Sequence, residues 1–294
     1  MCLFAKGMDV VRDAVLVAAG LGTRMFPSSA YQAKETLPLV DVPLLTHLIM
    51  EAKAAGITRF HVVTSPVKSF ESMLEDKQHL HALRSDLERS LFHITEGLEV
   101  HTHLQLEPKG VGNAIEAALG AIDGPFLVML GDNLMMDVHA PTTAYAPSMA
   151  SKHLVDAFAA HGEATVGLME VAEHEVSHYG IVALNGSKIT DVVEKPSAED
   201  APSRLAICGR YVFPATTSKL LEMHTYERHG ELQSIALQQH WMSEGTLHGV
   251  VFENTQWYDS GSPILWLQAQ VDHALRRPDL HSDFRAWLEQ RLQD

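Results

Sequence analysis

This sequence is poor in cysteine, in basic residues and in long apolar runs, and each shortage excludes a class of protein. Its 294 residues include 2 cysteines, Cys2 and Cys208, so it can form neither a disulfide framework nor a thiolate zinc site. The 22 Lys and Arg residues face 37 Asp and Glu residues, and the net charge of −15 opposes nucleic-acid binding, which needs an extended basic face. No apolar run approaches the roughly 18 residues of a membrane span, and Arg12 and Asp13 interrupt the N-terminal stretch that resembles a signal peptide. We therefore expect a cytoplasmic protein with no nucleic-acid partner and no membrane partner.

The order of the expected elements predicts an α/β fold. In the N-terminal half, apolar strands alternate with segments of helical periodicity, which implies a mostly parallel, Rossmann-like mixed sheet flanked by helices. The second half adds strands, a β-hairpin turning at Asn185-Gly186, and C-terminal helices. The expected strands span residues 14–19, 60–64, 100–105, 126–130, 166–171, 181–184, 189–194, 206–213 and 247–252. The expected helices span residues 44–52, 112–121, 264–276 and 284–292, together with a longer polar helical region over residues 69–91.

A glycine loop follows the first expected strand and predicts a polyphosphate site. The strand runs directly into Gly20-Leu21-Gly22-Thr23-Arg24, and Lys34 follows in a loop that contains prolines. Two close glycines let backbone N–H groups approach an anion without obstruction by a Cβ atom. Arg24 and Lys34 can then neutralise phosphate charge. A purely structural turn would explain the glycines but not the nearby cations.

Two common phosphate-binding motifs do not fit this loop. A dinucleotide fold requires a third glycine and an immediate helix, but Met25 stands at the third position. Pro27 and Pro38 bracket a segment without helical periodicity, which disfavours an oxidoreductase of the Rossmann type. A P-loop requires Gly-Lys, and the chain contains no such dipeptide.

The 18 histidines raise the possibility of a transition-metal site, but their spacing does not support one. His101 and His103 alternate on an expected strand, and solvent-facing strand histidines explain them better than metal ligands do. His79 and His81 stand two apart in a helical stretch and do not share a face.

Aspartates at two strand ends predict a magnesium site. Asp132 directly follows a buried strand, and Asp259 follows the strand that ends near Phe252. Ligands of open α/β sheets bind beyond the carboxyl ends of the strands, and Mg²⁺ takes one or two carboxylates together with substrate phosphates. Each aspartate taken alone could instead be a helix cap or a turn former.

Two motifs of this loop resemble the signature of the sugar-1-phosphate nucleotidylyltransferases. These are Gly20-x-Gly22-Thr23-Arg24 and Lys34-Glu35-x-Leu37-Pro38. Within that family the chain is most similar to the bacterial UTP–glucose-1-phosphate uridylyltransferases, from about residue 13 to the C-terminal helix. Tyr179-Gly180 and Glu194-Lys195-Pro196 match the family's Tyr-Gly and Glu-Lys-Pro motifs. Outside this resemblance, Glu194 and Lys195 would be a solvated pair before a proline turn.

The resemblance implies a role for each matching residue. The expected catalytic cations are Arg24, Lys34 and Lys195. The expected nucleotide-binding residues are Ala19, Gly20, Gly22, Glu35, Gln105 and Gly112. The expected sugar-phosphate-binding residues are Tyr179, Gly180, Glu194, Lys195 and Gly209. The expected ligands of the Mg²⁺ cofactor are Asp132 and Asp259.

The resemblance also implies a reaction and an organisation of the chain. The expected reaction is Mg-dependent transfer of UMP from UTP to glucose 1-phosphate, which gives UDP-glucose and pyrophosphate. The expected fold is that of nucleotidyltransferases, which is similar to glycosyltransferase A. We expect a single domain over residues 1–294, with a nucleotide-binding half (about 10–135), a sugar-phosphate-binding half (about 136–262) and C-terminal helices (about 263–294). The family implies a homo-oligomer, either a dimer or a tetramer.

Four positions depart from the family pattern and keep other functions open. Ala30 and Ala33 replace a lysine and a proline of the loop, and Ile235 and Ala236 replace a Thr-Asp pair. One alternative is a related enzyme that uses another base, such as that of dTTP, or another hexose. The second is a regulatory paralogue without catalysis, although retention of both aspartates and the flanking cations argues against it.

Overall fold

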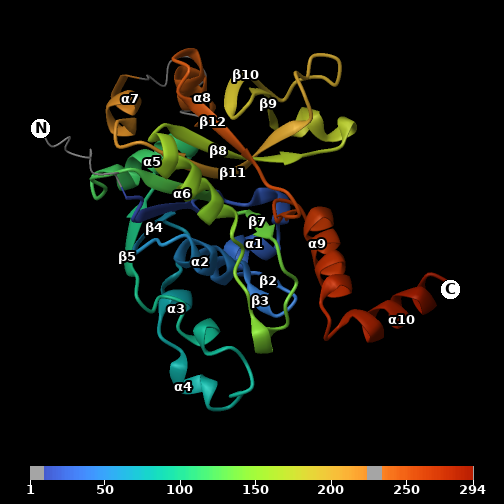
Figure 1. The fold of residues 1–294 in the computed structure, drawn as a ribbon. Coiled ribbons are helices and arrows are strands. Elements are labelled where there is room, and N and C mark those ends of the chain that lie inside the picture. Colours follow the sequence, from blue (N-terminus) through green and yellow to red (C-terminus); the bar gives the residue numbers. More distant parts are fainter. Residues whose placement is uncertain (1–9, 224–233, 294) are drawn as a thin grey trace, which may run out of the picture.

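The computed structural model describes residues 10–223 and 234–293. The fold is built around one nine-stranded sheet (Figure 1). The strand order is β5-β4-β1-β6-β11-β8-β12-β10-β9. The strands are β1 (Asp13–Val17), β4 (Arg59–Thr64), β5 (Glu99–Leu104), β6 (Phe126–Leu130), β8 (Ala164–Glu170), β9 (Gly180–Asn185), β10 (Lys188–Glu194), β11 (Leu205–Phe213) and β12 (Leu247–Val251). Strands from both halves of the chain therefore share one sheet.

Parallel pairing is concentrated in the first half of the chain. β5, β4, β1 and β6 are mutually parallel, whereas β11 is antiparallel to both β6 and β8. β12 is parallel to β8, and β9 and β10 form the expected hairpin around Asn185-Gly186. The predicted α/β fold with a mixed sheet is confirmed.

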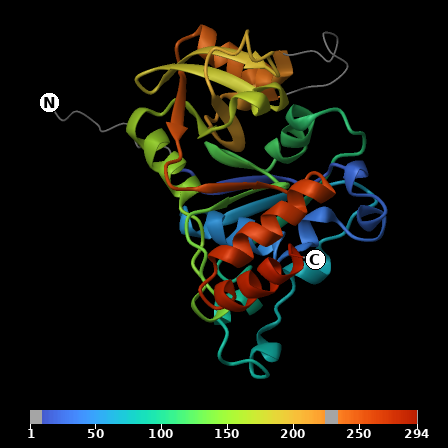
Figure 2. The same ribbon diagram turned by 90° about the vertical axis from the view of Figure 1, so that its right-hand side faces the viewer.

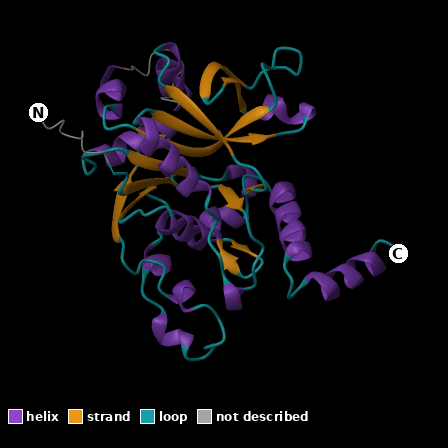
Figure 3. Ribbon diagram, viewed as in Figure 1, coloured by secondary structure: helices purple, strands orange, loops and turns teal. Residues whose placement is uncertain are grey.

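Two small sheets and a set of helices complete the fold (Figure 3). The small sheets pair β2 (Pro38–Leu39) with β3 (Val42–Pro43) and β7 (Asn133–Met136) with β13 (Gln256–Asp259). The helices are α1 (Ser28–Tyr31), α2 (Leu44–Ala54), α3 (Glu71–Leu74), α4 (Gln78–His81), α5 (Val111–Leu119), α6 (Ala150–His161), α7 (Thr217–Met223), α8 (Ser234–Ser243), α9 (Pro263–Arg276) and α10 (His281–Arg291). Short 3-10 helices span Thr23–Met25, Lys34–Thr36, Arg89–Phe92, Thr142–Ala144 and Glu173–His178. None of the described helices combines the length and the apolar character that a membrane span requires.

Hydrophobic clusters cover both faces of the large sheet. Alternate strand residues point to opposite faces, so Leu16 packs in the cluster that includes α2, α6 and α9, while Val15 packs in the cluster that includes α5, α7 and α8. Strands buried on both faces read as continuous apolar runs, which is why the sequence predicts them well. The sheet consequently holds its carboxyl-end loops on a rigid base.

The predicted helical region over residues 69–91 is wrong. The structure instead has α3, α4 and a 3-10 helix in this stretch, which extends away from the sheet in Figure 1. Leu80 and Leu83 are 41% and 78% exposed. These leucines therefore do not pack against an apolar surface of the protein. A helix in water gains little stability without such packing.

The interpretation of His101 and His103 as solvent-facing is also corrected. Both are half-buried on β5 and contact the fully buried His61 of β4. His103 Nε2 lies 2.9 Å from His61 Nδ1, and the His101 and His61 rings stack with centroids 5.0 Å apart. The parallel register places His61 beside His101, a pairing that the spacing within one strand does not reveal.

Candidate functional site

A cleft of about 950 Å³ lies beyond the carboxyl ends of the central strands and brings together residues from distant parts of the chain. Eight of the residues expected from the sequence line it: Arg24, Asp132, Tyr179, Gly180, Glu194, Lys195, Gly209 and Asp259. They come from the glycine loop, the end of β6, the β9–β10 hairpin, β11 and β13.

The glycine loop turns sharply at the end of β1. Gly22 has φ +65°, in the left-handed region that favours glycine. A Cβ atom there would lie 3.3 Å from Ser29 Cβ, and the Ser29 hydroxyl donates to the Gly22 carbonyl oxygen at 2.7 Å. The chain then enters a 3-10 helix rather than a long α-helix, as the absence of helical periodicity predicts.

The two aspartates meet through the small β7–β13 sheet. Asn133 of β7 pairs with Asp259 of β13, and the Ser260 N–H donates to the Asp132 carbonyl oxygen at 2.9 Å. Burial and the neighbouring Asp132 charge together raise the pKa of Asp259. The backbone pairing therefore brings the two aspartates close together, and a cation between their carboxylates would relieve the repulsion.

Two cations from the glycine loop and the segment after it lie beside this acidic pair. Lys34 Nζ lies 2.6 Å from Asp132 Oδ2, and the Lys34 side chain is 8% exposed. Burial alone would raise the pKa of Asp132, but the Lys34 ammonium holds it below its ordinary value. A Cβ atom on Gly261 would lie 2.7 Å from both Arg24 Nη2 and Asp259 Oδ1, so glycine leaves room for the guanidinium beside the carboxylate.

The end of the β9–β10 hairpin forms the opposite wall. Glu194 pairs with Gly180, and the Lys195 N–H donates to the Tyr179 carbonyl oxygen at 3.0 Å. Lys195 has φ +48°, an uncommon backbone conformation for a non-glycine residue. Its side chain is 63% exposed, with Nζ 3.8 Å from Glu194 Oε1. The hairpin thus presents one carboxylate and one ammonium to the cleft.

Gly209 sits in an irregularity of β11 on the floor of the cleft. The register of β11 with β8 shifts between Ile207 and Tyr211, and Gly209 has φ +71°. A Cβ atom at this position would lie 3.1 Å from the Leu130 side chain. Both the backbone conformation and the close approach require glycine here.

The expected base-binding residues lie at neighbouring strand ends and do not line the cleft described above. Ala19 packs in the same hydrophobic cluster as Ala114 of α5. Gln105 follows β5, and its amide donates to the Gly110 carbonyl oxygen and to Asn113 Oδ1, both at 3.0 Å. These bonds hold the Gln105 side chain against the start of α5, where Gly112 also lies.

Glu35 is a supporting residue in this structure, since its carboxylate is 1% exposed. Lys68 Nζ donates to Glu35 Oε2 at 3.0 Å and to the Ala18 carbonyl oxygen at 3.0 Å. Burial raises the pKa of Glu35 and lowers the pKa of Lys68, although each partner's charge counteracts the shift. Through these bonds the Glu35–Lys68 pair holds the loop after β1 in place. Sequence reasoning did not identify Lys68, because an isolated lysine carries no spacing signal.

A second group missed by the sequence orients Asp132. Asn133 Nδ2 donates to Asp132 Oδ1 at 2.7 Å, and Trp257 Nε1 donates to Asn133 Oδ1 at 2.6 Å. The Asn133 carbonyl oxygen accepts from the fully buried Arg210, at 2.8 Å. The carboxylate orientation therefore depends on the core as well as on Lys34.

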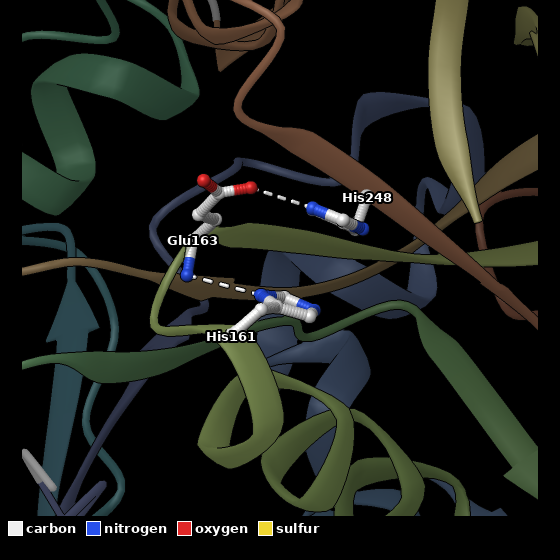
Figure 4. A group of neighbouring side chains, drawn as sticks. All are labelled: His161, Glu163 and His248. Carbon is white, nitrogen blue, oxygen red and sulfur yellow. Dashed lines mark hydrogen bonds and ion pairs between the residues drawn. The ribbon is translucent and has the colours of Figure 1, made fainter.

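A different cluster also has the residue types of a metal site (Figure 4). Among residues 10–223 and 234–293, His161, Glu163 and His248 form the group of three whose ligand atoms lie within 4.8 Å of one another. His248 Nε2 lies 2.6 Å from Glu163 Oε2, and the two imidazole rings stack at 3.9 Å and 15°. Stacked rings direct their nitrogen lone pairs side by side rather than toward one point. The arrangement fits a hydrogen-bonded pair of one imidazole and one carboxylate, with the second imidazole stacked on the first. It lies at the amino ends of β8 and β12, whereas Asp132 follows the carboxyl end of β6.

Comparisons with known proteins agree with the geometry of the cleft. The model of the Nucleotidyl transferase family matches residues 13–274. The UTP–glucose-1-phosphate uridylyltransferase YngB of Bacillus subtilis is 32% identical over 291 residues, which cover 95% of each chain. The UTP–glucose-1-phosphate uridylyltransferase of Streptococcus pyogenes is 32% identical over 293 residues, 96% of this chain and 94% of the relative.

Solved structures resemble the fold over the same extent. A UDP-glucose pyrophosphorylase from Acinetobacter baumannii has a TM-score of 0.79 and 28% identity, covering 96% of this chain and 99% of its own. A UDP-glucose pyrophosphorylase in complex with UDP-glucose has a TM-score of 0.76 and 28% identity, covering 90% and 98%.

Proposed function

Because the chain belongs to the nucleotidyl transferase family, we propose that it transfers UMP from UTP to glucose 1-phosphate. The products are UDP-glucose and pyrophosphate. The two relatives described above are named for this activity. One of the similar solved structures is a UTP-bound enzyme. The observation that carries the proposal is the single cleft with cations on two walls and two aspartates at its base.

The reaction requires positioning and charge neutralisation but no protein nucleophile. A non-bridging oxygen of glucose 1-phosphate attacks the α-phosphorus of UTP, and the bond from that phosphorus to the oxygen bridging the β-phosphorus breaks. Pyrophosphate leaves with the electron pair. Two anions must approach each other, so Arg24 and Lys34 neutralise the triphosphate while Lys195 neutralises the sugar phosphate.

Asp132 and Asp259 would hold a divalent cation, which we assign as Mg²⁺. Their oxygen donors and their mutual repulsion fit a hard cation. The cation would supply positive charge to the triphosphate and the leaving pyrophosphate. The lowered pKa of Asp132 keeps its carboxylate ionised and able to bind at neutral pH.

The remaining site residues divide between the two substrates. We assign Tyr179, Gly180, Glu194 and Gly209 to the sugar phosphate, because they line the cleft beside Lys195. We assign Ala19, Gly20, Gly22, Gln105 and Gly112 to the nucleotide, because they surround the phosphate loop and the start of α5. Glu35 supports that loop through Lys68.

The proposal extends to organisation, assembly and location. The halves about 10–135 and about 136–262 would bind the nucleotide and the sugar phosphate, with residues from about 263 forming C-terminal helices of the same domain. Leu267 and Trp287 of those helices are 59% and 50% exposed, which supports a homo-oligomer. Light scattering would measure its size. A cytoplasmic location follows from the proposed substrates, which are charged nucleotides and sugar phosphates of that compartment.

A pyrophosphate-release assay tests the function. It crosses four nucleoside triphosphates with several hexose 1-phosphates, with and without Mg²⁺, and includes the Asp132→Ala variant. UTP with glucose 1-phosphate should exceed every other pair, and chelation of the metal or loss of Asp132 should abolish release. A higher rate with dTTP or another hexose would support the related enzyme. UTP binding without release from any pair would support a regulator.

A further inference from the structure

Helix α8 contributes a buried amide to the cleft. Gln238 is 1% exposed and lines the cleft together with Gly209 and Tyr211. Among the residues that the structure describes, none hydrogen-bonds its side-chain oxygen Oε1. A buried acceptor of this kind costs about 1–3 kcal/mol of stability when it stays unpaired. Native proteins leave few such groups, so each needs an explanation.

The neighbours of Gln238 place it on the sugar-phosphate side of the cleft. Gly180, Glu194 and Lys195 line the same cavity. Ile235, one turn earlier on α8, is in contact distance of the Gly180 position, since a Cβ atom there would lie 3.4 Å from Ile235 Cδ1. Helix α8 therefore packs directly against the hairpin that presents Glu194 and Lys195.

The other polar residue that α8 contributes to the cleft already has a partner. Ser234 also lines it from α8, but its hydroxyl hydrogen-bonds the Tyr211 hydroxyl. Ile235 is apolar. Gln238 is thus the α8 residue that offers the cleft a buried polar atom without a described partner.

We propose that Gln238 Oε1 accepts a hydrogen bond from a hydroxyl group of the hexose 1-phosphate and makes this chain selective for sugars that carry it. The inference rests on the proposed function. The Gln238 oxygen needs a hydrogen-bond donor, and a hexose carries several hydroxyl groups that can donate. A deoxy analogue would leave the buried oxygen unpaired, whereas the matching sugar satisfies it on binding. Sites built in this way discriminate strongly against analogues that lack the hydrogen-bonding group.

The test is a double-mutant-type cycle in which protein variants at residue 238 are combined with deoxy analogues of the sugar substrate. Values of kcat/KM are measured with UTP and glucose 1-phosphate or its 2-, 3-, 4- and 6-deoxy analogues, for the wild type, Gln238→Leu and Gln238→Glu. Leucine has a similar size without an acceptor, and glutamate retains the acceptor oxygen. We expect one analogue to lose about 10–100-fold with the wild type and with Gln238→Glu. With Gln238→Leu that penalty should shrink to about 3-fold or less.

Stability and binding measurements separate this role from a structural one. Without substrate, Gln238→Leu should unfold at the same temperature as the wild type or a higher one, because it removes an unpaired buried acceptor. Equal deoxy penalties in wild type and Gln238→Leu would overturn the inference even where turnover is normal. If the wild type releases no pyrophosphate, the proposed function fails. In that case, calorimetry measures the binding of glucose 1-phosphate and its deoxy analogues to the wild type and to Gln238→Leu. Equal losses of affinity for the deoxy analogues in the two proteins would overturn the inference independently of the proposed function.

Discussion

Single residues shape the cleft by leaving space as much as by carrying charge. Gly209 and Gly261 stand where a Cβ atom would meet Leu130 and the Arg24 guanidinium, respectively. Each glycine lets a neighbouring side chain lie closer to the backbone than any other residue would allow. The charged groups of the site therefore depend on neighbours that carry no chemistry of their own.

The Gly209→Ala substitution should reduce the free energy of unfolding by more than its backbone conformation alone explains. Gly186→Ala is the matched control, because Gly186 has φ +62° and open space around its Cβ position, while Gly209 has φ +71° and a 3.1 Å contact. We expect a loss of about 1 kcal/mol for the control and a further 1–3 kcal/mol for Gly209→Ala. Urea unfolding measures both, and equal losses would contradict a steric requirement at residue 209.

Lys195→Ala should lower kcat/KM by about 10²–10³-fold with little change in stability. The side chain is 63% exposed, so its removal leaves no buried gap, but the sugar phosphate loses its neutralising charge. Lys188→Ala is the control, since Lys188 is exposed at the other end of the same strand. Steady-state kinetics at saturating UTP distinguish the two. Near-normal activity of Lys195→Ala would remove this lysine from the mechanism.

Sequence reasoning at the residue scale located the groups that belong to motifs. Arg24, Asp132 and Lys195, which the sequence singled out because each follows a strand end or matches a family pattern, line one cleft in the structure. Lys68 and Gln238 were not found, because their roles arise from packing between elements far apart in the chain. Ile235 and Ala236, which replace the Thr-Asp pair of the family, follow residues 224–233, which lie outside the part of the chain that the structure describes.

At the scale of elements, a buried ion pair joins the cleft to the core. Arg210 of β11 donates to both carboxylate oxygens of Glu51 on α2, each at 2.9 Å, and both side chains are fully buried. Ser151 of α6 also donates to Glu51, and Arg210 donates to the carbonyl oxygen of Asn133. Four elements thus fix the segment that carries Asp132.

Breaking this pair from one side should destabilise the protein strongly. Glu51→Gln or Arg210→Met should each cost about 3–5 kcal/mol, because one buried charge is left without its partner. The double variant should lose less than the sum of the single losses. Arg285→Gln on α10 is the control, because its partner Glu289 is exposed. This substitution should change the free energy of unfolding by no more than about 0.5 kcal/mol. Additive losses in urea unfolding would show that the pair acts as two independent residues.

Pairing between distant elements explains what the sequence could not predict. The strands of the large sheet follow from their apolar runs, but the pairing of β7 with β13, which brings Asp132 and Asp259 together, joins segments about 120 residues apart. The opposite error occurred over residues 69–91, where leucine spacing predicted a helix without a surface to bury it.

At the scale of the whole molecule, helix α9 lies beside the N-terminal part of the chain (Figure 2), where Arg277 pairs with Asp41. Two buried histidines, His273 and His47, belong to α9 and α2. His273 of α9 is 3% exposed, with Nδ1 2.9 Å from His139 Nδ1. His47 of α2 is 5% exposed, with Nδ1 3.0 Å from the Tyr145 hydroxyl. Burial, reinforced by neighbouring positive groups, lowers the pKa of His47 to about 3 and that of His273 to about 4.

These two histidines should make the fold sensitive to acid. Because each folded-state pKa lies below the unfolded value of 6.5, the unfolded chain binds more protons between about pH 3 and 6.5. Their contribution to stability is therefore complete above pH 6.5 and is lost as the pH falls. Between pH 7 and pH 5 each histidine should cost about 2 kcal/mol of unfolding free energy. Urea unfolding at the two pH values measures the change.

Replacing one histidine isolates its share. His273→Gln should reduce the loss between pH 7 and pH 5 by about 2 kcal/mol, whereas His153→Gln, on the exposed face of α6, should leave it unchanged. Glu35 acts in the opposite sense, since its raised pKa favours the folded state on acidification, but it is common to all three proteins. The difference between the variants therefore reports the histidine alone. An identical pH dependence for His273→Gln and the wild type would mean that His273 takes up a proton without loosening α9 from the rest of the molecule.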